Sequence, residues 1–434
     1  MTGSEVKEAQ GKLGVLVVGV GGAVASTFIA GTLAARKGLT KPIGSMTQLS
    51  HIKLKRDGKI VNEKLNDVIP LTQLNDIVFG GWDIFPENVY EAALHAEVLL
   101  AKDVDGILEE MQAIRPMKGV FDQNYVKRLN GTWIKTGATR WELMEQVRED
   151  IRSFKKENGC DRMVVLWAGS TEIFQKESAA HKSLEALEKA MKANDTDVAP
   201  SVCYAFAALM ERVPYINGAP NLTVDFPAMD ELAAKTGVAF CGKDFKTGQT
   251  LLKTVLAPMF KTRMLGLEGW FSTNILGNRD GEVLDEPSNF KTKEESKLSV
   301  IESILVADDY PDLYSDIYHK VRINYYPPRK DNKESWDNID LVGWMGYPMQ
   351  MKVNFLCRDS ILAAPLCLDL VLLTDLAQRS GLSGMQTWLG FYFKSPMHAP
   401  GKLPRHDIFV QYDVLKNKLR ELIGEETFDL EEGE

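Results

Sequence analysis

The hydrophobic pattern opens with an almost unbroken apolar run, residues 13–18, which is typical of a parallel strand buried on both faces. Three glycines, Gly19, Gly21 and Gly22, follow within a few residues, and the proline-free stretch 23–35 then predicts a helix. A strand, a glycine turn and a helix in this order present backbone N–H groups to a pyrophosphate. The alternative is a tight strand–helix turn that requires a positive φ angle.

Further apolar runs predict strands at 76–84, 162–167 and 237–241. Between and after them, helices are expected over 87–113, 141–156, 202–212 and 229–235. This alternation predicts an α/β protein with a Rossmann-like doubly wound parallel sheet. The polar stretch 42–74 interrupts the pattern, and its short alternating pieces around the turn 56–59 predict a hairpin at the rim.

Polar residues stand where several of these strands end. The strand 76–84 ends in Asp83 and Ile84, and an acid in that place binds the adenosine ribose in a Rossmann unit. A solvated loop aspartate is the alternative. The strand ending at Cys241 leads to Thr247, Gly248, Gln249 and Thr250 at a helix N-terminus, where hydroxyls and N–H groups suit a phosphate monoester. Thr247 could instead serve only as the helix N-cap.

Past residue 250 the periodicity changes. Residues 320–325 and 349–355 alternate apolar and polar positions, which predicts half-buried strands of an α+β unit. Trp336, Trp344 and Tyr347 form a larger apolar set than one small sheet needs, so we expect this unit to pack across subunits.

Lysine spacing adds candidate chemistry to this second unit. Lys293 and Lys297 are four residues apart, so they share one helix face. Two like charges on a partly buried face lower one pKa and favour a neutral amine. A solvated helix face, with Glu294 and Glu295 as ion-pair partners, is the alternative.

Composition narrows the class of protein. The 434 residues carry a net charge of −9, and the basic residues have acidic neighbours, which argues against a nucleic-acid partner. No secretory signal is expected in 1–12, and the apolar run 361–373, interrupted by Pro365 and Asp369, is expected to be too short and too polar to span a membrane. Five cysteines without a C-x-x-C pair predict reduced thiols in a cytoplasm, and six scattered histidines predict no metal site. The acidic tail 425–434 is expected to be disordered.

Several short motifs, in this order, resemble those of the myo-inositol-1-phosphate synthase family over nearly the whole chain. They lie at residues 19–22, 44–48, 81–84, 165–168, 215–218, 246–250, 274–281, 290–297 and 358–365. The chain departs from the family pattern at Ala23 and Val24, where many members carry two asparagines. It also carries Arg279 where a second asparagine is usual, which resembles a bacterial branch.

The resemblance implies an NAD-dependent isomerase that cyclises glucose 6-phosphate to 1D-myo-inositol 3-phosphate by C5 oxidation, enolisation, intramolecular aldol and re-reduction, with no net redox. It implies a homotetramer. It also implies an NAD-binding domain over 1–250, an inserted catalytic and tetramerisation domain over 251–358, and a C-terminal segment, 359–434, that returns to the first domain.

By the same resemblance, site residues are carried over position by position. The cofactor set is Gly19, Gly21, Gly22, Ala23, Val24, Asp83, Ile84, Ala168, Ser170, Thr171, Gly218, Asp244 and Asp359. The catalytic set is Lys293, Lys297, Lys333, Lys394 and Asn278, and the phosphate set is Thr247, Gly248, Gln249 and Thr250. Two other readings stay open: a dehydrogenase of a small phosphorylated substrate with net hydride transfer, and a non-enzymatic NAD-binding regulator.

Overall fold

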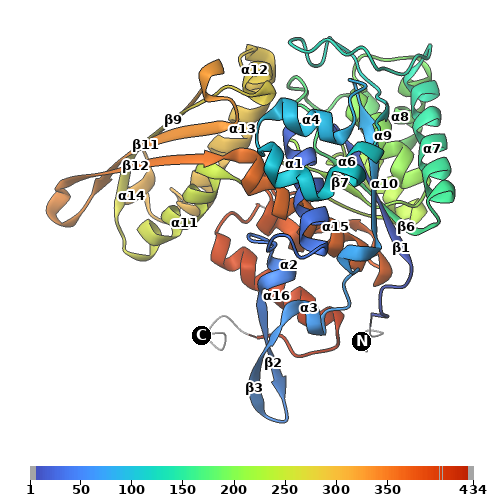
Figure 1. Cartoon of the computed structure of the whole chain (residues 1–434). Helices are drawn as coiled ribbons and strands as arrows, with labels where there is room; N and C mark the ends of the chain where they lie inside the picture. Colours follow the sequence, from blue (N-terminus) through green and yellow to red (C-terminus); the bar gives the residue numbers. More distant parts are fainter. Residues whose placement is uncertain (1–5, 400, 403, 429–434) are drawn as a thin grey trace.

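A computed structural model describes residues 6–399, 401–402 and 404–428; the side chains of 294–299 lie outside the described part. The larger of two units is built on a parallel sheet in the order β13-β8-β7-β6-β1-β4-β5 (Figure 1). The strands are β1 Lys12–Val18, β4 Ile77–Asp83, β5 Met117–Lys118, β6 Cys160–Trp167, β7 Tyr215–Asn217, β8 Ala239–Gly242 and β13 Gly384–Met385. The predicted doubly wound α/β sheet is confirmed.

Helices cover both faces of this sheet. One face packs against α1 Ala23–Arg36 and α15 Asp359–Arg379, with α16 Ile408–Leu422 in the same core cluster, and the other packs against α7 Arg140–Glu157, α9 Pro200–Met210 and α10 Pro227–Thr236. Because β1 has β4 on one side and β6 on the other, chain order reverses beside β1. In open α/β sheets this reversal is where a ligand binds.

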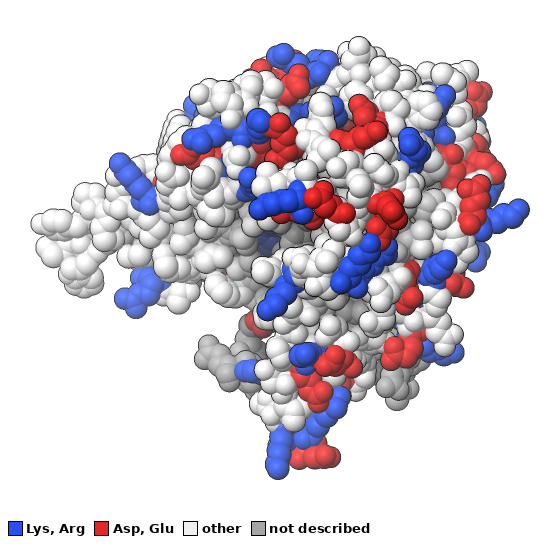
Figure 2. Space-filling view, viewed as in Figure 1, with Lys and Arg blue, Asp and Glu red and all other residues white. Residues whose placement is uncertain are grey.

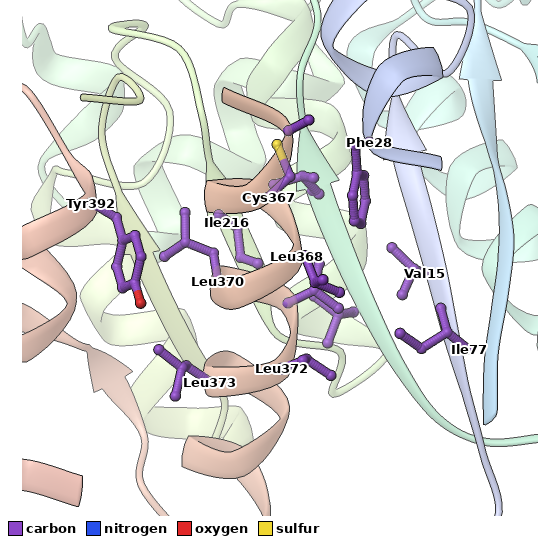
Figure 3. Close-up of a cluster of buried hydrophobic side chains, with 14 of the residues drawn as sticks. Val15, Phe28, Ile77, Ile216, Cys367, Leu368, Leu370, Leu372, Leu373 and Tyr392 are labelled. Atoms are coloured by element: carbon purple, nitrogen blue, oxygen red, sulfur yellow. The ribbon is translucent and has the colours of Figure 1, made fainter. Parts of the chain in front are cut away.

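Helix α15 completes the core of the larger unit although it follows the smaller unit in the chain. Its Leu368 and Leu372 belong to the same buried cluster as Phe28 of α1 and Val15 of β1 (Figure 3). Pro365 and Asp369, which interrupt the apolar run in the sequence, lie inside α15, which is continuous for 21 residues. Its mean hydropathy of 1.8 and its length would allow it to cross a membrane, but 78% of its most apolar window is buried inside the protein, as in a core helix.

The stretch 87–113 also differs from its prediction. Instead of one helix it forms α4 Val89–Ala96, α5 Ala101–Val104 and α6 Leu108–Ala113. Helix α4 ends because Glu97 adopts a left-handed conformation with φ 53°. The pattern of apolar and polar residues does not predict this end. The rim hairpin is present as β2 His51–Arg56 and β3 Lys59–Lys64, joined by Asp57 and Gly58 at positive φ.

The smaller unit is a mixed sheet in the order β10-β9-β11-β12. Its strands are β9 Gly266–Leu276, β10 Tyr318–Tyr325, β11 Asn332–Val342 and β12 Pro348–Arg358; β9 and β11 were not predicted. Trp270 and Ile339 of this sheet pack on α11 Gly248–Thr262 and α13 Pro287–Ile304. The remaining helices are α2 Met46–Leu49, α3 Leu65–Val68, α8 Leu184–Lys192, α12 Arg279–Leu284 and α14 Pro311–Tyr314.

The opposite face of the smaller sheet is exposed. Phe271, Tyr318, Trp336 and Leu356 are 39%, 64%, 37% and 59% exposed, and Trp344 at the β11–β12 turn is 89% exposed. The β11–β12 hairpin projects from the body (Figure 1) and carries few charges in the view of Figure 2. The rest of that view mixes acidic and basic side chains.

Candidate active site

The glycine turn between β1 and α1 is shaped for close approach. Gly19 has a φ of +79°, and a Cβ there would lie 2.8 Å from the Cα of Gly169. A Cβ on Gly22 would lie 3.0 Å from the carbonyl oxygen of Gly19. Gly22 precedes α1 and has no side chain to cap it, so the N–H groups of the first turn, at Ala23 and Val24, are left for a ligand. The turn therefore fits a pyrophosphate group.

Asp83 holds this turn against the end of β4. Its Oδ2 accepts from the Gly21 N–H at 2.8 Å, and its Oδ1 accepts from the Ile84 and Phe85 N–H groups at 2.8 and 3.1 Å. Burial raises the pKa of Asp83, and these three hydrogen bonds oppose that rise. Asp83 is therefore built into the glycine turn, unlike a solvated loop aspartate.

A cavity of about 460 Å³ lies along this edge of the sheet, a size typical of small-molecule sites. It brings together residues expected from distant motifs: Gly19, Gly21, Gly22, Ala23, Val24, Asp83, Ile84, Ala168, Ser170, Thr171, Gly218, Asp244, Thr247, Asn278, Lys293, Asp359 and Lys394. Lys333, Gly248, Gln249 and Thr250 are not among its lining residues. Lys297 falls in the stretch whose side chains the structure does not describe.

Two lysines share one carboxylate oxygen at the cavity wall. Asp244 Oδ1 accepts from Lys293 Nζ at 2.8 Å and lies 3.4 Å from Lys394 Nζ. The three side chains are 2%, 11% and 4% exposed for Asp244, Lys293 and Lys394. Asp244 comes from the turn after β8, Lys293 from α13, and Lys394 from the segment before α16. Three elements far apart in the chain thus meet at one charged cluster.

The two lysines differ in pKa. Burial lowers the pKa of Lys293, but the carboxylates of Asp244 and Asp280 outweigh it, so the net shift is upward. This is opposite to the lowering expected for a lysine on the Lys293–Lys297 face. Burial also lowers the pKa of Lys394, Asp244 offsets only part of it, and the charge of Lys293 adds to the lowering. Of the two amines, Lys394 is therefore the one that loses its proton more readily.

A second ion pair joins β11 to the first residue of α15, beside Thr247 at the start of α11. Lys333 Nζ donates to Asp359 Oδ2 at 3.1 Å. Burial alone would raise the pKa of Asp359, but the Lys333 and Lys394 charges and a hydrogen bond from the Thr247 hydroxyl hold it well below its usual range. Thr247 makes no side-chain cap to α11, which excludes the simple N-cap alternative.

The side-chain amides of Gln249 and Asn278, two residues expected at the site, are hydrogen-bonded to other protein groups. The Gln249 amide bonds to Thr273 and Asp337 and accepts from Asn274, all inside the smaller unit. Asn278 lines the cavity, yet its Oδ1 caps α12 through the Gly281 N–H at 3.0 Å and its Nδ2 donates to Asp331 at 2.9 Å.

The residues that fix α13 to the larger unit were not predicted from the sequence. Asn289 Nδ2 donates to the Thr171 carbonyl at 2.9 Å, and Thr292 Oγ1 donates to the Glu172 carbonyl at 3.0 Å. Glu172 itself lines the cavity, and burial raises its pKa to about 7 against the opposing bonds from Ser201. Glu172 lies in the loop that follows a buried strand, and this position was the signal in the sequence that could have identified it.

Comparison with known proteins gives concordant results. The family model described as myo-inositol-1-phosphate synthase matches residues 13–420. The chain is 66% identical over 427 residues to inositol-3-phosphate synthase 1 of Bacteroides thetaiotaomicron, covering 98% of this chain and 99% of that protein. It is 32% identical to inositol-3-phosphate synthase of Saccharomyces cerevisiae, covering 95% and 85% of the two chains.

The crystal structure of inositol-3-phosphate synthase from Caenorhabditis elegans superposes with a TM-score of 0.89 at 29% identity, covering 96% of this chain and 87% of that one. The matching family model describes an NAD-binding domain, and the glycine turn and the cavity suit that cofactor. The chain belongs to the myo-inositol-1-phosphate synthase family.

Proposed function

We propose that this protein is an inositol-3-phosphate synthase that converts D-glucose 6-phosphate to 1D-myo-inositol 3-phosphate with no net redox. The observation that carries the proposal is the buried Lys293–Asp244–Lys394 cluster on the wall of a cavity that also holds the glycine turn. The chemistry needs a base and a cation beside one substrate oxygen, and this cluster supplies both. The high identity to a protein named inositol-3-phosphate synthase supports the same activity.

Cofactor binding is assigned to the larger unit. The glycine turn with Ala23 and Val24 would hold the pyrophosphate, and Asp83 with Ile84 would face the adenosine ribose. Ala168, Ser170, Thr171 and Gly218 line the wall toward Asp244. When bound, NAD supplies the reversible oxidation and reduction at C5.

Proton movement is assigned to the two lysines on Asp244. Lys394, with its lowered pKa, accepts the proton of the C5 hydroxyl. Lys293, with its raised pKa, keeps its charge and donates a hydrogen bond to the same oxygen. Asp244 orients both amines from one oxygen atom, and Asp359 and Asn278 shape the wall beside them.

The substrate phosphate is assigned to the N-terminus of α11. Thr247 lines the cavity, and backbone N–H groups of Gly248, Gln249 and Thr250 lie in the first turn, where the helix dipole favours an anion. Lys333, paired with Asp359 beside Thr247, adds positive charge, and we assign Lys297 the same role from its sequence position. We assign both lysines also to the stabilisation of the oxyanions that develop during ring closure.

We further propose a cytoplasmic homotetramer, with the smaller unit as its catalytic and tetramerisation part. The exposed apolar residues of the smaller sheet support assembly through that face. All five cysteines are free, which suits a reducing compartment.

The deciding experiment supplies glucose 6-phosphate with stoichiometric NAD⁺ and measures periodate-releasable phosphate together with absorbance of NADH. Inositol 3-phosphate should accumulate while NADH absorbance stays near zero. Stoichiometric accumulation of NADH would refute the proposal and favour a dehydrogenase, and neither product would favour a non-enzymatic NAD-binding protein.

A further inference from the structure

His406 lies between the two elements that carry the lysines of the cluster. It is 2% exposed and sits just before α16. Its Nε2 is 3.1 Å from the carbonyl oxygen of Lys394, and its Nδ1 is 2.6 Å from Oγ of Ser303. Ser303 is on α13, the helix that carries Lys293. One imidazole therefore links α13 to the Lys394 segment.

The partners fix which ring nitrogen carries the proton. A carbonyl oxygen only accepts, so Nε2 carries the hydrogen and donates it to Lys394. Burial and the nearby charge of Lys246 lower the pKa of His406 to about 4, so the ring is neutral at pH 7. Nδ1 is then an acceptor for the Ser303 hydroxyl, which lies 2.6 Å from Nδ1 and 2.9 Å from the carbonyl oxygen of Val300, so the two acceptors share its single hydrogen.

This bond completes the restraint on the main chain of Lys394. The Lys394 N–H donates to the carbonyl oxygen of Asp244 at 2.6 Å, and the Lys394 carbonyl accepts from His406. The position of the Lys394 side chain relative to Asp244 and Lys293 therefore depends on both bonds. His406 is not among the residues lining the cavity, so it acts on the site through the segments that it links and not by touching the substrate.

We propose that His406 is a positioning residue that holds Lys394 at its catalytic distance from Asp244, and that Ser303 holds the imidazole in place from α13. This inference rests on the proposed function, because Lys394 is taken as the base at the C5 oxygen. A displacement of about 1 Å in a reacting group lowers rates on the order of 100-fold, so loss of the Nε2 donor should appear in kcat.

The test compares His406→Gln with His406→Asn. The Gln amide reaches the place of Nε2 and keeps a donor for the Lys394 carbonyl, whereas the Asn amide reaches only the place of Nδ1. We expect kcat for inositol 3-phosphate formation within about threefold of wild type for His406→Gln and lowered on the order of 10- to 100-fold for His406→Asn. The Kd for NAD, measured by calorimetry, should be unchanged in both. His398→Asn, at an exposed histidine of the same segment, serves as the matched control and should behave as wild type.

Equal kcat losses in the Gln and Asn variants, or wild-type kcat in both, would overturn the assignment. If the Asn variant does not fold, Ser303→Ala and Ser303→Thr decide instead: the proposal requires a lower kcat in Ala and near-normal kcat in Thr, which keeps the hydroxyl. A wild-type enzyme that forms no inositol 3-phosphate would overturn the proposed function, and the role of His406 with it.

Discussion

Replacing Asp244 by asparagine tests the cluster on which the proposed function depends. The change keeps the shape of the side chain but removes the negative charge between two buried amines, at 2.8 Å from Lys293 Nζ and 3.4 Å from Lys394 Nζ. At an effective dielectric constant of about 20, these distances correspond to attractions of about 6 and about 5 kcal/mol. Desolvation offsets much of this, and breaking a buried pair typically costs about 3–5 kcal/mol.

The loss should appear mainly in turnover. About 3 kcal/mol of lost orientation and charge stabilisation corresponds to a fall in kcat on the order of 100-fold. Without the carboxylate, the pKa values of both lysines fall, because Asp244 raises each of them. The acidic limb, set by deprotonation of Lys394, and the alkaline limb, set by loss of charge at Lys293, should therefore both move to lower pH. Single-turnover oxidation of C5-deuterated glucose 6-phosphate across the pH range measures both effects.

The ion pair between Lys243 and Asp225 provides a matched control. Lys243 pairs with Asp225 at 2.6 Å, but those side chains are 22% and 19% exposed, and neither lines the cavity. Asp225→Asn should change kcat by less than about threefold, because this pair does not line the cavity. If Asp244→Asn kept the kcat and pH profile of this control, the cluster would be a structural ion pair and the reasoning would be wrong.

Four further outcomes are expected. In Gly21→Val, a Cβ 3.1 Å from Asp83 Oδ2 disturbs the turn, so calorimetry should show loss of NAD affinity in a folded protein, and unchanged affinity would refute the loop assignment. Lys333→Ala should raise KM for glucose 6-phosphate without altering the NAD Kd; unchanged KM would place the phosphate elsewhere. Trp336→Asp should shift sedimentation from tetramer toward smaller species, whereas a monomeric wild type would contradict the assembly. Glu172 has a folded pKa of about 7 against an ordinary 4.5, so its protonated form stabilises the native state, and that stability is lost as pH rises from about 4.5 to about 7. Thermal midpoints of Glu172→Gln should accordingly depend less on pH than those of wild type, and equal dependence would contradict it.

Local patterns predicted much of the larger unit. The apolar run 13–18, the three glycines and the helix after them appear as expected, and Asp57 and Gly58 close the rim hairpin where turn chemistry placed it. The failures were also local in origin. Helix α4 ends at a left-handed Glu97 that carries no sequence signal. The three-residue strand β7 is too short for any periodicity to reveal.

The sequence by itself determined the α/β class, the glycine turn and, through ordered motifs, the family, because these depend on residue type and on spacing along the chain. Only the tertiary structure decided which charges meet. Lys293, Lys394 and Asp244 come from three elements, and their pKa values depend on burial and on distances that no local pattern encodes. For the same reason the sequence predicted a lowered pKa on the Lys293 face, while the fold places a carboxylate against Lys293 and leaves Lys394 as the amine that burial tends to neutralise.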